Sequence, residues 1–105
     1  RLGAYECVLV TGSRTWEAYE KETLIKERHR HRYEFNNKYM EEFESHGMKC
    51  VGINPASDLL EIVEIPDMKW YIGTQFHPEY SSTVLNPHPL FMSFVKACID
   101  GAAQA

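Results

Sequence analysis

The hydrophobic and polar positions of the chain predict several short strands. Over Ala4–Val10, Cys7 and Leu9 share one face, and the intervening valines point the other way. Three further strands are predicted over Met48–Ile53, Leu59–Ile65 and Trp70–Phe76, and residues 24–33 can also be extended. The first two of these are joined by the turn sequence NPASD. We expect the later strands to be antiparallel.

The clearest start and stop of a helix lies in NNKYMEEFESHG. Asn36 or Asn37 can accept the first backbone N–H bonds as N-cap, and Gly47 suits the left-handed residue that ends a helix. A shorter helical turn is predicted around Trp16–Tyr19. The apolar stripe of the Asn-capped helix, which we expect to belong to the core, consists of Tyr39, Met40 and Phe43.

A second, longer helix is predicted in PHPLFMSFVKACIDG. Pro89 fits its first turn and Gly101 its end. Its apolar positions, also expected to be core, recur at helical spacing and are Leu90, Phe91, Phe94, Val95, Cys98 and Ile99. Short strands with two flanking helices predict an α/β or α+β fold.

Composition narrows the function classes. The chain has 105 residues and a formal net charge of -4, which argues against general nucleic-acid binding because phosphate-tracking domains carry a basic excess. No apolar run approaches the roughly 20 residues that cross a bilayer. The cysteines, Cys7, Cys50 and Cys98, include no CxxC pair, so we expect reduced core thiols and neither a zinc ribbon nor a disulfide framework.

The segment ERHRHRYEFNN, residues 27–37, concentrates positive charge in an acidic chain. His29 and His31 resemble a metal-binding pair, but a metal site needs a third ligand and only His77 is plausible. If the segment is extended, Arg28, Arg30 and Arg32 point to one side. Nucleic acid, a metal and a small anionic substrate are the candidate ligands, with simple solvation of most of these side chains as the alternative.

The segment WYIGTQFHPEY places His77 and Glu79 directly after a predicted strand. A histidine with a carboxylate two residues away can form a pair in which the carboxylate orients the ring and the free nitrogen accepts a proton. Taken alone, the pattern also fits an ordinary surface loop. A thiol nucleophile would need a sharp strand-to-helix elbow flanked by glycines, and none of the three cysteines has one.

These segments, taken together with RLGAYECVL and GINPASDLLEIVEIP, resemble the C-terminal part of the glutaminase domain of the CTP synthase family, a group of class I (triad) glutamine amidotransferases. The resemblance covers residues 1 to about 100. It implies an α/β fold, a flavodoxin-like open sheet with flanking helices, that is incomplete on its own. We therefore expect residues 1–105 to be a partial glutaminase domain, with the nucleophile elbow and the synthetase domain absent.

The resemblance also implies a reaction. The family hydrolyses L-glutamine at a Cys–His–Glu triad and passes ammonia to a synthetase domain that aminates ATP-activated UTP to CTP. By resemblance, His77 is the general base, Glu79 its orienting carboxylate and Arg32 the residue that holds the glutamine. One arginine can grip an α-carboxylate through two N–H bonds.

The resemblance further implies that this chain holds no cofactor, that ATP, Mg and UTP bind in the synthetase domain, and that GTP is an allosteric effector, for which Arg28 or Arg30 is a candidate contact. The full enzyme is expected to be a cytoplasmic homotetramer with no nucleic-acid or membrane partner. These 105 residues alone are expected to be inactive. The alternative is a non-catalytic scaffold of the same family that uses Arg32 to bind an anion.

Overall fold

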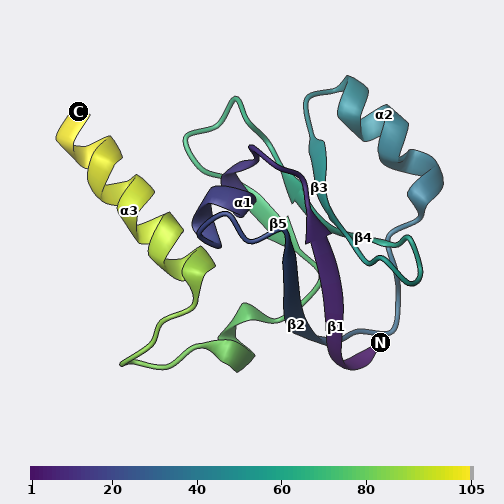
Figure 1. The fold of residues 1–105 in the computed structure, drawn as a ribbon. Coiled ribbons are helices and arrows are strands. Elements are labelled where there is room, and N and C mark those ends of the chain that lie inside the picture. Colours follow the sequence, from purple (N-terminus) through teal and green to yellow (C-terminus); the bar gives the residue numbers. More distant parts are fainter. Residues whose placement is uncertain (105) are drawn as a thin grey trace.

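Five strands form one antiparallel sheet in the computed structural model, which describes residues 1–104 (Figure 1). The strand order is β2-β1-β3-β4-β5, and each neighbouring pair is antiparallel. The antiparallel pairing of the later strands is therefore confirmed. The strands are β1 (Leu2–Leu9), β2 (Leu24–Arg30), β3 (Lys49–Ile53), β4 (Leu60–Glu64) and β5 (Ile72–Thr74).

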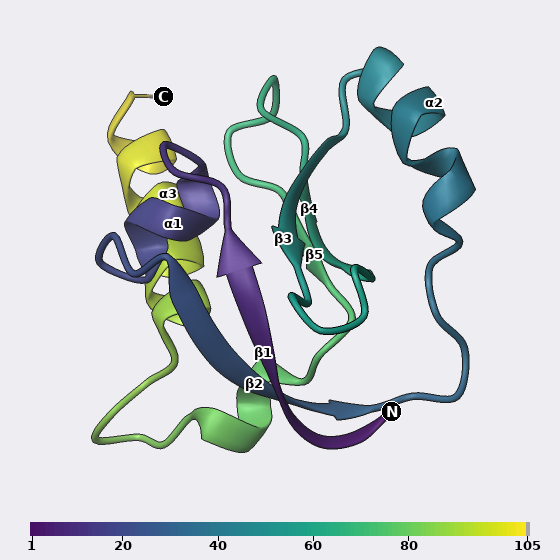
Figure 2. The ribbon, with the colours of Figure 1, turned by 45° about the vertical axis from the view of Figure 1, so that its right-hand side comes forward.

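The helices gather at opposite ends of this sheet. Figure 2 shows α1 and α3 together on one side and α2 on the other. Their bounds are α1 (Arg14–Ala18), α2 (Met40–Ser45) and α3 (Pro89–Gln104), with short 3-10 turns η1 (Asn37–Tyr39) and η2 (Pro78–Ser81). The mixed α/β class predicted from the sequence is confirmed. No helix among residues 1–104 is both long enough and apolar enough to span a membrane.

The core lies against one face of the sheet. On β1, Cys7 and Leu9 are buried and the alternate residues are exposed, as the alternation predicts. Trp16 of α1 packs against the same cluster. The buried hydrophobic cluster consists of Cys7, Leu9, Tyr19, Ile25, Val51, Ile62, Phe76 and Leu90.

The predicted caps of α2 and its preceding turn are present. The Asn36 side chain accepts a bond from the Lys38 backbone N–H and caps η1, which continues directly into α2. At the other end, Gly47 has a φ of 93°, and the Met48 N–H bonds the Phe43 carbonyl in a Schellman-type closure. A left-handed residue at this position favours glycine because it lacks a Cβ.

Two predictions about α3 are wrong. The helix continues through Gly101 to Gln104, because Gly101 does not take the left-handed conformation that ends a helix. Its apolar stripe is not core apart from Leu90, which is 3% exposed. Phe94 packs on Trp70 at 5.0 Å between ring centroids but stays half-exposed. The exposed remainder of the stripe comprises Phe91, Val95, Cys98 and Ile99.

The stripe of α2 is likewise more exposed than predicted. Tyr39 is 43% exposed and Phe43 is 39% exposed, and Met40 is only half-buried. Phe43 contacts Phe35, with ring centroids 5.4 Å apart, and the two form a small apolar contact outside the main core. Helical periodicity shows which side chains share a face, but it does not show whether another element covers that face.

Candidate active site

His77 is held at the end of the sheet by two backbone features. It follows the last strand, β5, by three residues, and Pro78 opens the 3-10 turn η2 directly after it. Its backbone N–H donates to the Arg28 carbonyl of β2 at 2.9 Å. A proline cannot continue the strand pairing, so the chain turns here and presents the histidine at the surface.

The His77 and Glu79 side chains form the expected hydrogen-bonded pair. His77 Nδ1 lies 2.8 Å from Glu79 Oε2. This bond to the ring is the largest cause that lowers the pKa of the Glu79 carboxyl, so the group stays ionised. Tyr80 stacks on the imidazole at 5.0 Å and 15°, which fixes the plane of the ring.

The free nitrogen of His77 is open to a reactant. No hydrogen bond found within residues 1–104 uses Nε2, and the His77 side chain is 37% exposed. A carboxylate acceptor at Nδ1 keeps the ring proton there, so Nε2 is the unprotonated nitrogen of the neutral ring. The pair is therefore arranged to accept a proton at Nε2 and to stabilise the imidazolium that forms.

Arg32 follows the end of β2 and is exposed. It borders a shallow hollow with Arg1, Leu2, Arg30 and His31, and a second hollow containing Arg30 and Tyr80 adjoins it. No contact within the described residues joins Arg32 to His77 or Glu79. The structure thus places Arg32 just beyond the end of β2, beside the N-terminal residues Arg1 and Leu2, and does not bring it together with His77 and Glu79.

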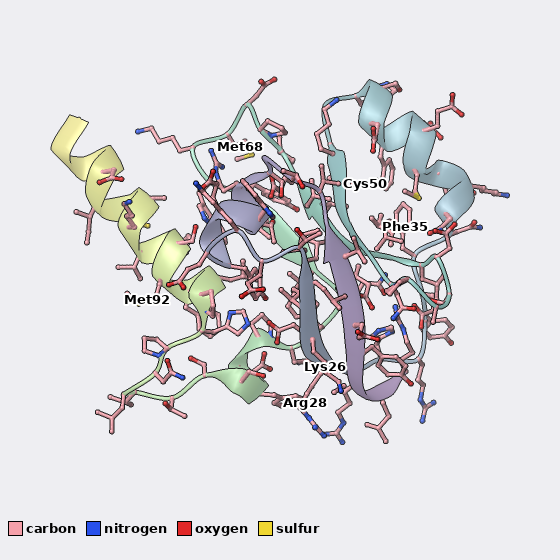
Figure 3. All side chains as sticks on the ribbon, in the orientation of Figure 1. Lys26, Arg28, Phe35, Cys50, Met68 and Met92 are labelled. Carbon is pink, nitrogen blue, oxygen red and sulfur yellow. The ribbon has the colours of Figure 1, made fainter. Side chains whose placement is uncertain are left out.

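The other arginines of the basic segment face outward from β2. Arg28 and Arg30 are exposed, as their alternate positions predict. Figure 3 shows Lys26 and Arg28 at the same end of β2, with Arg28 extending away from the sheet. The positive charge of the segment therefore lies on one exposed face, and its alternate positions face the interior.

Simple solvation, the alternative considered for most side chains of the basic segment, is wrong for His29. Its side chain is 1% exposed, because it occupies an inward position of β2 beside Ile25 and Glu27. His29 Nδ1 lies 2.8 Å from His31 Nε2, so the two rings bond each other. Within the described residues, no group of three or more His, Cys, Asp or Glu side chains is arranged to hold a metal ion.

The three cysteines do not approach His77. Cys7 is buried against Gly52, so closely that a Cβ added at Gly52 would lie 2.8 Å from the Cys7 sulfur. This burial raises the pKa of the Cys7 thiol far above the usual range. Burial and the Glu44 carboxylate raise the pKa of Cys50 to about 11. Cys50 lies beside α2, away from η2 (Figure 3). The predicted core position is wrong for Cys98, which is exposed on α3 because nothing described covers that face.

A buried polar cluster escaped the sequence analysis. Glu27 of β2 bonds both the Tyr19 hydroxyl and His88 Nε2, and all three side chains are buried. Burial, followed by the bond to Glu27, raises the pKa of Tyr19. The available signal was the alternation of β2, which places Glu27 and His29 on the same face as Ile25.

Comparisons with known proteins show the family of the chain. The sequence profile of the family described as "Glutamine amidotransferase class-I" matches residues 3–97. A CTP synthase of Bacteroides fragilis is 76% identical over 100 residues, which cover 95% of this chain and 19% of that protein. A CTP synthase of Porphyromonas gingivalis is 58% identical over 99 residues, covering 94% of this chain and 18% of that protein.

A solved structure shares the fold. The glutaminase domain of Trypanosoma brucei CTPS, which has acivicin bound, matches with a TM-score of 0.87 and 35% identity, over 94% of this chain and 39% of that chain. The chain spans about a fifth of the length of the curated relatives it matches, 19% and 18% for the two above. On the family match over residues 3–97, the chain belongs to the class-I glutamine amidotransferase family.

Proposed function

We propose that this chain is the part of a CTP synthase glutaminase domain that supplies the histidine and glutamate of a Cys–His–Glu triad. The observation that carries the proposal is the His77 Nδ1 to Glu79 Oε2 bond of 2.8 Å with Nε2 left open, in a chain 76% identical to a CTP synthase. The substrate is L-glutamine and the products are glutamate and ammonia.

His77 transfers protons at Nε2. It accepts the proton of a cysteine thiol, which lies outside these 105 residues in the gene product, and the thiolate attacks the amide carbonyl carbon of glutamine. The resulting imidazolium returns this proton to the amide nitrogen as the C–N bond breaks and ammonia leaves. Water then adds to the thioester with His77 as base, which releases glutamate and restores the thiol.

Glu79 and Arg32 have different roles in this reaction: Glu79 supports the proton transfer and Arg32 binds the substrate. The Glu79 carboxylate holds the ring tautomer and stabilises the imidazolium. The exposed Arg32 guanidinium is free to bind the α-carboxylate of glutamine through two parallel N–H bonds. Holding the substrate there would bring its amide carbonyl toward the histidine and convert an encounter into an oriented complex.

The ammonia would serve the amination of UTP to CTP in a synthetase domain, which also would bind ATP and Mg. The described residues offer no cluster suited to a metal, and we assign no step of that reaction to them. A homotetramer, a cytoplasmic location and GTP activation, with Arg28 or Arg30 as a candidate effector contact, stay predictions of the family resemblance. A scaffold that only binds an anion through Arg32 is the competing hypothesis, and an elbow cysteine in the gene product would distinguish the two.

The test is the His77→Ala substitution in the full gene product. Glutamine-dependent CTP formation should fall roughly 10³-fold or more, because general acid–base catalysis contributes about 10² to 10⁴. Ammonia-dependent formation should persist, because free ammonia bypasses the glutaminase. Loss of both activities together in a folded variant would refute the assignment of His77 to the glutaminase reaction.

A further inference from the structure

His29 contacts both segments that carry the proposed site residues. Its ring centroid lies 5.9 Å from that of Phe76, the residue before His77, at 71°. It lies 5.0 Å from that of His31, the residue before Arg32. One buried side chain thus contacts the residue before the proposed proton acceptor and the residue before the proposed substrate arginine.

The position of His29 is fixed by its surroundings. The side chain is 1% exposed, and the Tyr5 ring packs edge-on against it at 5.5 Å and 88°. The Glu61 carboxylate lies 3.0 Å from Nε2, although not in hydrogen-bonding direction. Its backbone pairs with Gly3 in the β1–β2 ladder. A side chain held from the sheet and from three neighbours can act as a rigid spacer.

His31 in turn fixes the chain on both sides of Arg32. The His31 backbone N–H donates to the Arg1 carbonyl at 3.0 Å, and its carbonyl accepts from the Arg1 nitrogen. Its ring Nδ1 lies 2.9 Å from the Tyr33 carbonyl oxygen. The His31 imidazole therefore connects the residue before Arg32 with the backbone carbonyl of the residue after it.

The bonding partners determine the direction of the hydrogen bonds. A carbonyl oxygen only accepts, so His31 Nδ1 carries the proton, and Nε2 of the neutral ring accepts. His29 Nδ1 must then donate to it across the 2.8 Å contact. Burial, followed by the nearby charge of Arg1, lowers the pKa of His29 to about 4, which leaves a neutral ring with one proton for this bond.

We propose that His29 and His31 are positioning residues of the glutaminase site, which together set the placement of Arg32 relative to His77. This inference rests on the proposed function. The backbone supports the same coupling, because the Arg28 carbonyl beside His29 also holds the His77 N–H. Neither histidine needs to touch substrate; each acts through its neighbour.

The first test compares His31→Ala with His31→Asn in the full gene product. His31→Ala removes the bond to Tyr33 and should raise the KM for glutamine about tenfold, with kcat at saturation changed less than about twofold, because orientation of a binding group is lost rather than chemistry. In His31→Asn the side-chain amide can replace Nδ1 as donor to Tyr33 but not Nε2 as partner of His29, so the KM should lie between those of the wild type and His31→Ala. Equal KM values in all three proteins would overturn the proposal.

The second test is His29→Leu, which keeps apolar volume and removes the ring nitrogens. Because His29 contacts both segments, this variant should raise the KM for glutamine and also lower kcat, each by about tenfold, while ammonia-dependent CTP formation stays unchanged. Wild-type glutamine kinetics in His29→Leu would overturn the spacer role. If this variant fails to fold, the His31 pair decides, because the His31 side chain is 16% exposed and its replacement disturbs the core less than that of the fully buried His29.

The Arg32→Ala variant distinguishes a failure of the proposed function from a failure of the positioning role. If Arg32→Ala raises the KM for glutamine and His31→Ala does not, the proposed function stands and the positioning role is wrong. If Arg32→Ala leaves the KM unchanged, the carboxylate clamp is wrong and the positioning role falls with it. The expected result is that Arg32→Ala and His31→Ala change the KM in the same direction, with the His31→Asn variant between His31→Ala and the wild type.

Discussion

Two histidine–glutamate pairs lie at the two ends of the loop that joins β5 to α3. At one end His77 bonds Glu79, and the two side chains are 37% and 54% exposed. At the other end His88 bonds Glu27, and the two side chains are 2% and 3% exposed. The same chemical pair thus occurs once at the surface, where both residues belong to the loop, and once in the interior, where His88 of the loop meets Glu27 of β2.

The difference lies in the second ring nitrogen. His88 Nδ1 accepts the Leu90 backbone N–H at 3.0 Å, so both of its nitrogens have partners inside the fold. His77 uses only Nδ1 within the described residues. A proton-transfer group needs a ring nitrogen that a reactant can reach, whereas a structural histidine has both ring nitrogens bonded within the fold. The comparison supports our proposal that His77 is the reactive member, and it makes His88 an anchor that ties α3 to β2.

The largest effect should come from breaking the buried pair. His88→Ala leaves Glu27 as a buried carboxylate with one partner fewer and should lower the free energy of unfolding by about 4 kcal/mol. His88→Gln is the matched control, since its amide can still donate to Glu27, and should lose less than half as much. Urea denaturation measures both, and equal losses would contradict the anchor role of the bond.

A third histidine, His29, should make the stability of the fold depend on pH. His29 has a pKa lowered to about 4 by burial, whereas an unfolded histidine titrates near 6.5. Between these values the unfolded chain binds more protons, so stability is complete above pH 6.5 and is lost as the pH falls toward 4, by about 3 kcal/mol. Urea denaturation at several pH values tests this, and His29→Leu should lack that part of the acid dependence. A slope equal in the two proteins would contradict it.

The exposed pair should affect rate and not stability. Glu79→Gln removes the charge that stabilises the imidazolium and should lower glutamine-dependent kcat about 100-fold, with the free energy of unfolding changed by less than about 0.5 kcal/mol. Steady-state glutaminase assays and urea denaturation measure the two quantities. A stability loss similar to that of His88→Ala would show that the surface pair is structural.

The smallest effect concerns substrate binding. Arg32→Lys keeps the charge but cannot form two parallel bonds to a carboxylate, so the KM for glutamine should rise about tenfold, equivalent to ~1.4 kcal/mol. Arg30→Lys is the matched control on the neighbouring outward position of β2 and should change the KM less than about twofold. Equal KM shifts in the two variants would assign the effect to general charge and not to Arg32.

Much of the sheet could be predicted because period-two alternation records burial directly. The positions of Cys7 and Leu9 on β1, the NPASD turn and the Asn36 cap all follow from local sequence. The burial of His29 was missed because the charge of the surrounding arginines concealed an alternation that continues through Ile25, Glu27 and His29. Partners distant in sequence, such as Glu27 and His88, cannot be paired from periodicity.

For the helices, the sequence predicted burial that the structure does not have. The stripes on α2 and α3 have the spacing of core faces, yet Phe43 and Ile99 are 39% and 63% exposed. Spacing defines a common face and says nothing of its cover, which depends on tertiary packing. In the candidate site, the sequence placed His77 next to Glu79 correctly, because the two are separated by one proline, and it could not supply the distance from either to Arg32.

The most direct test is the ratio of glutamine-dependent to ammonia-dependent CTP formation, measured for His77→Ala and His88→Ala in the full gene product under conditions where both are folded. If His77 is the general base, this ratio should fall roughly 10³-fold in His77→Ala and stay within about twofold of the wild-type value in His88→Ala. An unchanged ratio in His77→Ala, or an equal fall in both variants, would contradict the assignment.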